Sequence, residues 1–151
     1  MNHMFYNCLS LNILNLFNFD TSNVKGMDKM FYNCILITSL DLSNFNTSQV
    51  QKMNNMFYNC INLFFLNLSN FDISNVNETK HMFYNCSSLR TLYLSNYEIS
   101  NINNLINMFD EIHNLEYINL SVLNLNGTIK DIFFLAYPNM VICGKIMMIF
   151  L

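Results

Sequence analysis

The chain has 151 residues, enough for one domain with a substantial core and too few for two such domains. Apolar residues make up 52% and charged residues 11%, which excludes an intrinsically disordered chain. The net charge of -3 comes from scattered residues without a basic stripe, so nucleic acid is not an expected partner. We expect neither a transmembrane segment nor a signal peptide, because no apolar run approaches the roughly 18 to 20 residues that span a bilayer and the first residues lack a basic region.

The dominant feature of the sequence is an internal repeat. Each unit carries the string Met-Phe-Tyr-Asn-Cys, or in the fifth copy a weaker form with Ile112 in the cysteine position. The copies begin at a constant step of 26 positions, at Met4, Met30, Met56, Met82 and Met108. Leucines at alternate positions follow each string, as in Leu40-x-Leu42, and this alternation is typical of a short strand with one buried face.

A second spacing within each unit predicts a short helix. In the third copy the apolar side chains fall at i, i+3, i+6, i+7 and i+10, on one stripe of a helix of about ten residues: Val50, Met53, Met56, Phe57 and Cys60. A serine just before each stripe is the expected N-cap. The asparagine near its end can adopt the left-handed conformation that stops a helix.

One such unit cannot bury both its leucines and its helical stripe, so we expect the units to stack. The predicted fold is an α/β repeat solenoid with one short parallel strand and one short helix per unit. Because helices are wider than strands, at roughly 10 Å against ~4.8 Å, the sheet should line the concave side of an arc.

The expected array covers 1–123, and 124–151 is expected to be a degenerate last coil with a C-terminal capping tail. In this last coil, Tyr137-x-x-Met140-x-Ile142 repeats the leucine pattern that begins at Leu115 in the unit before, but after a shorter step than in the array. At the other end Met1 falls halfway through a unit, which truncates the first coil. We therefore expect the chain to be a fragment of a longer array.

The repeat resembles a known family. L-x-x-L-x-L at Leu63 to Leu68 and at Leu89 to Leu94 is similar to the core of a leucine-rich repeat. The longer string M-F-Y-N-C-x-x-L-x-x-L-x-L-S-N-F-[DN]-x-S-x-V resembles the BspA-like repeats of bacterial and protist surface proteins, over roughly Met1 to Leu123. The resemblance implies a protein-binding or adhesive role at the cell surface or after secretion, a protein ligand such as a host or extracellular protein, and no catalysis.

The outward side chains of the predicted strands are the candidate contact surface. Aromatic rings alternate there with short polar groups, as in many protein-binding patches. The alternative is that strands simply favour aromatic and β-branched residues. The candidate partner-binding residues on this concave face are Phe17, Asp41, Phe65, Asn67, Thr91, Tyr93, Tyr117 and Asn119.

The cysteines do not form a predicted metal site. Four of them recur once per unit without a C-x-x-C pair, and Ile112 replaces the thiol in the fifth copy. We expect buried free thiols at these positions, with disulfides and a metal site as less favoured alternatives.

The remaining titratable residues suggest no catalytic arrangement. The histidines lie outside the apolar stripes and should face solvent: His3, His81 and His113. A column of acidic or amide side chains precedes the serine caps and is assigned to helix-start electrostatics, with a calcium site as the alternative: Asp20, Asn46, Asp72 and Glu98. We therefore expect no catalytic, cofactor-binding or metal-binding residues and no enzyme activity.

The sequence thus predicts a protein-interaction or adhesion module that binds a partner through its concave sheet. The alternative is a partial gene product with structural content only and no ligand of its own.

Overall fold

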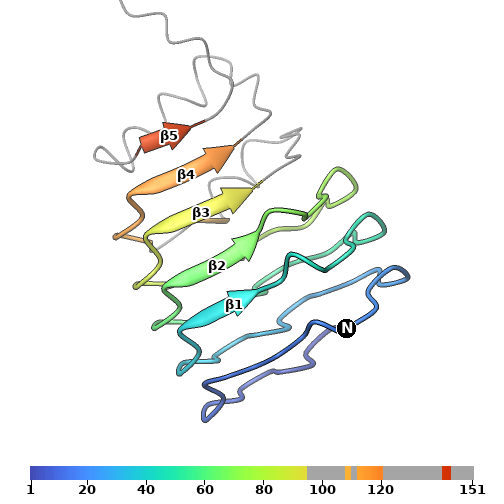
Figure 1. Ribbon diagram of the computed structural model, residues 1–151, viewed down its shortest axis with the longest axis horizontal. Helices are drawn as coiled ribbons and strands as arrows, with labels where there is room; N and C mark the ends of the chain where they lie inside the picture. Colours follow the sequence, from blue (N-terminus) through green and yellow to red (C-terminus); the bar gives the residue numbers. More distant parts are fainter. Residues whose placement is uncertain (95–107, 110–111, 121–140, 144–151) are drawn as a thin grey trace, which may run out of the picture.

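The computed structural model describes residues 1–94, 108–109, 112–120 and 141–143, and in them five short strands form one parallel sheet (Figure 1). The strands lie in the sheet in chain order: β1 (Ser39–Asp41), β2 (Phe65–Leu68), β3 (Thr91–Leu94), β4 (Tyr117–Leu120) and β5 (Val141–Cys143). The fold is β-rich and repeat-like, with one strand in each unit from the second onward. The predicted parallel strands are confirmed for these units.

The register of the sheet follows the repeat. Leu40 lies beside Leu66 and Leu92 beside Ile118, so that equivalent positions of successive units are neighbours. These four side chains are at most 1% exposed. The side chains between them, such as Phe65 and Tyr93, point to the opposite face, as alternation along a strand requires.

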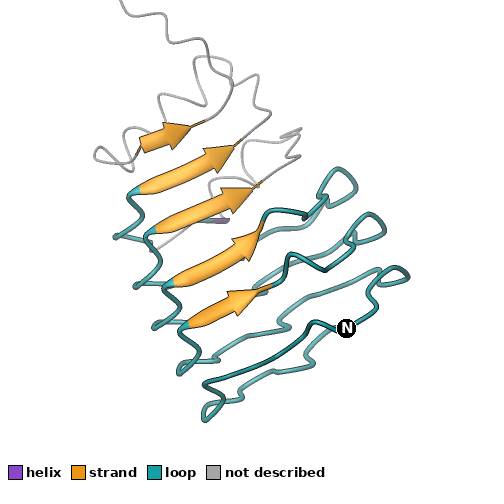
Figure 2. Ribbon diagram, in the orientation of Figure 1, coloured by secondary structure: helices purple, strands orange, loops and turns teal. Residues whose placement is uncertain are grey.

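The helical half of the prediction is wrong for the first four units, whereas in the fifth unit the described residue Met108 is helical. Residues 50–60, where the spacing predicts a helix, form turns and extended segments, and Figure 2 shows the corresponding parts of the first four units as loops. Backbone N–H groups on alternate residues donate to the next unit: Lys29 to the carbonyl of Asn54 at 2.9 Å, Phe31 to Met56 at 2.8 Å and Asn33 to Tyr58 at 2.9 Å. A helix would use these N–H groups within its own turns, so the two arrangements exclude each other.

Tight turns reproduce the apolar spacing that suggested a helix. Tyr58 donates its N–H to the carbonyl of Asn55 at 3.2 Å, and Cys60 donates to Phe57 at 3.1 Å. Asn55 and Asn59 have positive φ angles of 55° and 58°, so each turn changes the chain direction and brings side chains three or four positions apart to the same side. The predicted left-handed asparagine is confirmed, but it forms part of a turn and does not end a helix.

The reason for expecting an arc also disappears. Helices would have spread the units apart on one side, whereas the units here stack at similar distances on both sides. Ring centroids on the side opposite the strands are 5.5 Å apart for Phe31 and Phe57 and 4.6 Å apart for Tyr58 and Tyr84. These values are close to the ~4.8 Å between neighbouring strands.

The core lies between the strands and the turn segments. Equivalent phenylalanines stack nearly parallel in one column, with successive ring centroids 5.3 to 5.5 Å apart: Phe5, Phe31, Phe57, Phe83 and Phe109. Buried methionines, leucines and thiols form similar series in the same hydrophobic cluster. The predicted burial of these residue types, one unit above another, is confirmed in the described units.

In the described units, the serines expected as helix N-caps belong to side-chain turns instead, while Ser100 lies outside the described residues. Oδ1 of Asp20 accepts the N–H of Ser22 at 3.0 Å, and Asp72 and Ser74 repeat this bond at 3.0 Å. Hydrogen bonds from the serine side chain and backbone lower the pKa of both carboxyl groups. Asn46 and Ser48 form the same turn, so the column is explained by turn geometry; Glu98 lies outside the described residues.

Strand β5 continues the sheet with a shifted spacing. Ile142 lies beside Ile118, whereas the leucine pattern in the sequence had aligned Ile142 with Leu120. The boundary at residue 123 and the capping role of 124–151 fall outside the described residues, apart from β5 itself.

Candidate functional site

Six of the candidate side chains lie on the side of the sheet opposite the buried leucines, which we call the outer sheet face: Asp41, Phe65, Asn67, Thr91, Tyr93 and Tyr117. Seven of the eight predicted residues form two columns across the strands, and the eighth, Phe17, lies outside the strands. Asp41, Asn67, Tyr93 and Asn119 are paired in register along one column. The other column contains Phe65, Thr91 and Tyr117, which occupy the same repeat position. The structure therefore brings together seven of the eight residues on consecutive strands.

Aromatic rings dominate this face. Phe65 and Tyr93 are each 45% exposed although both lie in strands. The rings of Tyr93 and Tyr117, diagonal neighbours on β3 and β4, have centroids 5.7 Å apart and are tilted by 49°. The contact between the two rings restricts their side chains, and the strands fix the backbone on which they stand. The result is a rigid, partly apolar surface.

Two of the predicted residues also hold turns. Oδ1 of Asp41 accepts the N–H of Ser43 at 2.9 Å, and Oδ1 of Asn67 accepts the N–H of Ser69 at 3.1 Å. Hydrogen bonds from Ser43 lower the pKa of the Asp41 carboxyl group, which stays ionised and exposed at neutral pH. These residues have a structural use whether or not a partner is bound.

Phe17 lies outside the strands. Its side chain is 77% exposed, and the segment around it in the first unit is not a strand. Phe64, which the sequence analysis missed, is 57% exposed and adjoins Phe65. At the positions of Phe64 and Phe65, the neighbouring units have Thr38-Ser39 and Arg90-Thr91. This difference between the units was the signal in the sequence that could have identified Phe64.

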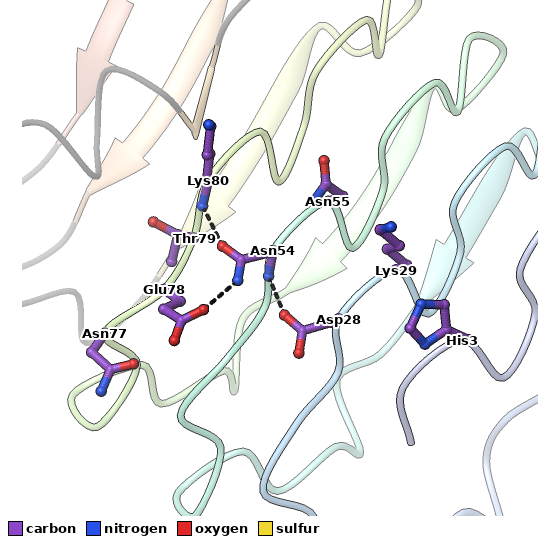
Figure 3. Close-up of a pocket in the computed structure, with 9 residues that line it drawn as sticks. All are labelled: His3, Asp28, Lys29, Asn54, Asn55, Asn77, Glu78, Thr79 and Lys80. Atoms are coloured by element: carbon purple, nitrogen blue, oxygen red, sulfur yellow. Dashed lines mark hydrogen bonds between the residues drawn. The ribbon is translucent and has the colours of Figure 1, made fainter.

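The turn side of the units contains a shallow polar pocket of about 540 Å³ (Figure 3). Asn54 connects its parts: the backbone N–H donates to Oδ1 of Asp28 at 2.9 Å, Nδ2 donates to Oε2 of Glu78 at 2.6 Å, and Oδ1 accepts the N–H of Lys80 at 3.0 Å. Its lining residues are His3, Asp28, Lys29, Asn54, Asn55, Asn77, Glu78, Thr79 and Lys80.

The polar groups of this pocket largely bind one another. Glu78 also pairs with Lys52 at 2.7 Å, and this hydrogen bond lowers the pKa of the Glu78 carboxyl group. The acceptors Asn2, Asp28 and Asn54 each bind the backbone N–H of the residue 26 positions later. This ladder connects the units, and its regular spacing was visible in the sequence but was overlooked. Within the described part of the chain, no group of three or more potential ligands could hold a metal ion.

The thiols of the repeat are buried and free, as predicted, in three units. Cys34, Cys60 and Cys86 are fully buried, and Cys8 is half-buried. The Sγ of Cys60 donates to the carbonyl of Phe31 at 3.1 Å. Burial raises the pKa of Cys34 and Cys86 to about 12, so neither is a thiolate near neutral pH. The side chain of Cys143 falls outside what the structure describes.

The histidines lie on the surface to different extents. His3 and His113 are exposed, as expected, whereas His81 is half-buried. The rings of His3 and His81 lie 5.5 Å and 5.4 Å from those of Tyr6 and Tyr84. Both histidines therefore pack beside the tyrosine column.

No helix in the described segments is long and apolar enough to cross a membrane.

Comparison with known proteins identifies a family. Neither the curated proteins nor the solved structures include a match to the chain. One family model, described as "Mycoplasma protein of unknown function, DUF285", matches residues 1–122, which include strands β1 to β4. The chain therefore belongs to the DUF285 family.

Proposed function

We propose that the chain is a protein-interaction and adhesion module, a solenoid of the BspA-like leucine-rich-repeat kind that binds a protein partner through its outer sheet face. The observation that carries this proposal is the aromatic group formed by Phe65, Tyr93 and Tyr117 on consecutive strands. Rigid aromatic side chains provide much of the binding energy at protein interfaces because they bury a large area at little entropic cost.

The surroundings of this group support a protein partner. Short polar side chains surround the rings, and Asp41 provides one ionised group at the edge of the sheet. The nearby ion pair between Arg90 and Glu116 neutralises its own charge, so the face has no strong field of one sign. A nucleic-acid partner would require a strongly positive surface to neutralise its phosphates.

The proposed location and partner depend on the family resemblance of the repeat. A cell-surface or secreted protein with this architecture presents its sheet to a host or extracellular protein. The proposal includes no catalytic step. Burial raises the pKa of the Cys34, Cys60 and Cys86 thiols, and each is 0% exposed, so these thiols are poorly suited to act as nucleophiles.

A triple substitution tests the proposal. Phe65→Ser, Tyr93→Ser and Tyr117→Ser together remove the aromatic group while leaving the buried leucines in place. The chain is titrated against a panel of immobilised extracellular-matrix proteins and against cultured host cells. We expect the triple variant to lose at least tenfold in apparent affinity for whichever surface binds the unmodified chain, with an unchanged circular dichroism spectrum.

Leu36→Ser is the matched control, since Leu36 is 45% exposed but lies outside the strands. It should leave binding unchanged. Equal binding by the triple variant would place the contact surface elsewhere. Failure of the unmodified chain to bind any member of the panel would favour the alternative, a repeat segment with structural content and no ligand of its own.

A further inference from the structure

The tyrosines of the repeat form a column on the side of the units opposite the strands. Equivalent rings stack on one another, with centroids 5.0 Å apart for Tyr6 and Tyr32, 4.6 Å for Tyr32 and Tyr58, and 4.6 Å for Tyr58 and Tyr84. The last two pairs are almost parallel, with interplanar angles of 6° and 7°. We call these four residues the tyrosine column.

The tyrosine column reaches the surface, unlike the phenylalanine column beside it. Phe57 is 0% exposed, whereas the adjoining Tyr58 is half-buried, as are Tyr32 and Tyr84. A small oxidant can therefore reach the edges of these rings from solvent. Desolvation and the neighbouring phenols of Tyr58 and Tyr6 raise the pKa of Tyr32 above its ordinary value of 10.0. At neutral pH this side chain is a phenol, so its oxidation removes a proton together with an electron.

The repeat aligns equivalent atoms of neighbouring rings. Two nearly parallel rings that occupy the same position in successive units have their equivalent carbons separated by close to the centroid distance. In the pairs Tyr32–Tyr58 and Tyr58–Tyr84, the carbon beside the hydroxyl group therefore faces its counterpart in the next ring. Tyr93 and Tyr117 differ in this respect, because they occupy different repeat positions and their rings are tilted by 49° at 5.7 Å.

We propose that the tyrosine column is a site of oxidative cross-linking, at which a haem peroxidase with hydrogen peroxide joins Tyr58 to an adjacent tyrosine of the column. Each phenol loses one electron and one proton and becomes a phenoxyl radical. The two radicals form a carbon–carbon bond between the positions beside their hydroxyl groups. The hydrogens on these two carbons then move to the oxygens and restore both phenols. Hydrogen peroxide takes up the two electrons and two protons and is reduced to two molecules of water.

The cross-link would join one unit of the stack to the next. The two rings have to tilt toward each other at one edge to form the bond, and their position at the surface allows this movement. A bond between residues 26 positions apart restricts the unfolded chain and so stabilises the stack. The thiols of the same units are poorly suited to this task, because Cys34 and Cys86 are buried and burial raises the pKa of each to about 12. The proposal does not depend on the function proposed for the outer sheet face.

Oxidation of the full chain tests the proposal. The chain is treated with a haem peroxidase and hydrogen peroxide at a concentration low enough to suppress coupling between molecules. Dityrosine fluorescence is measured in the monomeric fraction, and tandem mass spectrometry of proteolytic peptides identifies the joined residues. We expect a cross-link of Tyr58 to Tyr32 or to Tyr84, with the loss of two hydrogen atoms. The urea midpoint of the cross-linked chain should rise.

Two double variants show whether stacking directs the reaction. Tyr6→Phe with Tyr58→Phe leaves Tyr32 and Tyr84 with a phenylalanine ring between them. Tyr6→Phe with Tyr32→Phe removes as many hydroxyl groups from the same column but leaves Tyr58 beside Tyr84. Both variants keep every stacked ring, so their circular dichroism spectra should be unchanged.

We expect at least fivefold less dityrosine in the monomeric fraction of the first variant than in that of the second. In concentrated urea, where the stack is lost, the two yields should be equal. Equal yields from the folded variants would overturn the proposal. So would the absence of dityrosine within the monomer of the unmodified chain, or cross-links that map only to tyrosines outside the column.

Discussion

Asn59 donates its side-chain amide to Oδ1 of Asn33, the residue 26 positions earlier, at 2.8 Å. Its own Oδ1 accepts from Asn85 at 2.7 Å, and its φ angle is 58°. One residue type therefore meets two requirements at once. It tolerates the left-handed turn within its unit, and it connects that unit to both neighbours.

Two substitutions at Asn59 separate these roles. Asn59→Gly keeps the left-handed backbone but removes two side-chain hydrogen bonds, and should lower the free energy of unfolding by about 1 to 3 kcal/mol. Asn59→Ala adds the strain of a left-handed alanine and should cost about 1 to 2 kcal/mol more. Urea unfolding measures both values. Equal costs would mean that the backbone conformation contributes nothing.

Leu66 and Phe65 are adjacent in β2 but point to opposite faces. Leu66 is 1% exposed, so Leu66→Ala should lower the free energy of unfolding by about 2 to 5 kcal/mol, through lost burial and a remaining cavity. Phe65→Ala, at an exposed position, should change it by less than about 1 kcal/mol. Chemical denaturation of the two variants makes the comparison, and a cost below about 1 kcal/mol for Leu66→Ala would place it outside the core.

The buried thiols predict a loss of stability in alkali. Burial raises the pKa of Cys34 to about 12 from an ordinary value of 9.0, so the folded chain retains this proton more tightly than the unfolded chain. The stabilising effect is complete below pH 9 and is lost as the pH rises from there toward 12. We expect the urea midpoint to fall over this range.

Cys34→Val is the control for this effect, because it keeps an apolar side chain without the titrating group. The difference in urea midpoint between the unmodified chain and Cys34→Val should therefore change with pH above 9. A constant difference would show that the thiol does not titrate with unfolding.

Thr47 links two units through a buried hydroxyl group. It is 1% exposed, and its Oγ1 donates to the carbonyl of Asp72 and accepts the N–H of Asp72, both at 2.8 Å. Thr47→Val keeps the shape but leaves these two backbone groups without partners, at a cost of about 1 to 3 kcal/mol for each unsatisfied group. Thr38→Val, at an exposed position, should stay within about 0.5 kcal/mol. Thermal unfolding distinguishes them, and equal melting temperatures would contradict the assigned role.

The candidate surface was only partly visible in the sequence. Alternation along the strands placed Phe65, Tyr93 and Tyr117 on one exposed face, because side-chain direction in a strand is a local property. The turn bonds of Asp41 and Asn67 are local, because each joins residues only two positions apart. The exposure of Phe64 did not follow from the motif.

The sequence by itself determined the repeat period, the register of strands β1 to β4 and the burial of the leucines, methionines and thiols, since repetition with fixed spacing permits one in-register stack. It could not decide between a helix and a series of turns around Met53 to Cys60. Both conformations turn the same apolar side chains inward, so the pattern fits either. The two conformations differ in the acceptors of the backbone N–H groups. The N–H of Phe31 donates to the carbonyl of Met56 in the next unit, whereas in a helix it would donate within its own unit. Only the packing of one unit against the next brings these two groups together.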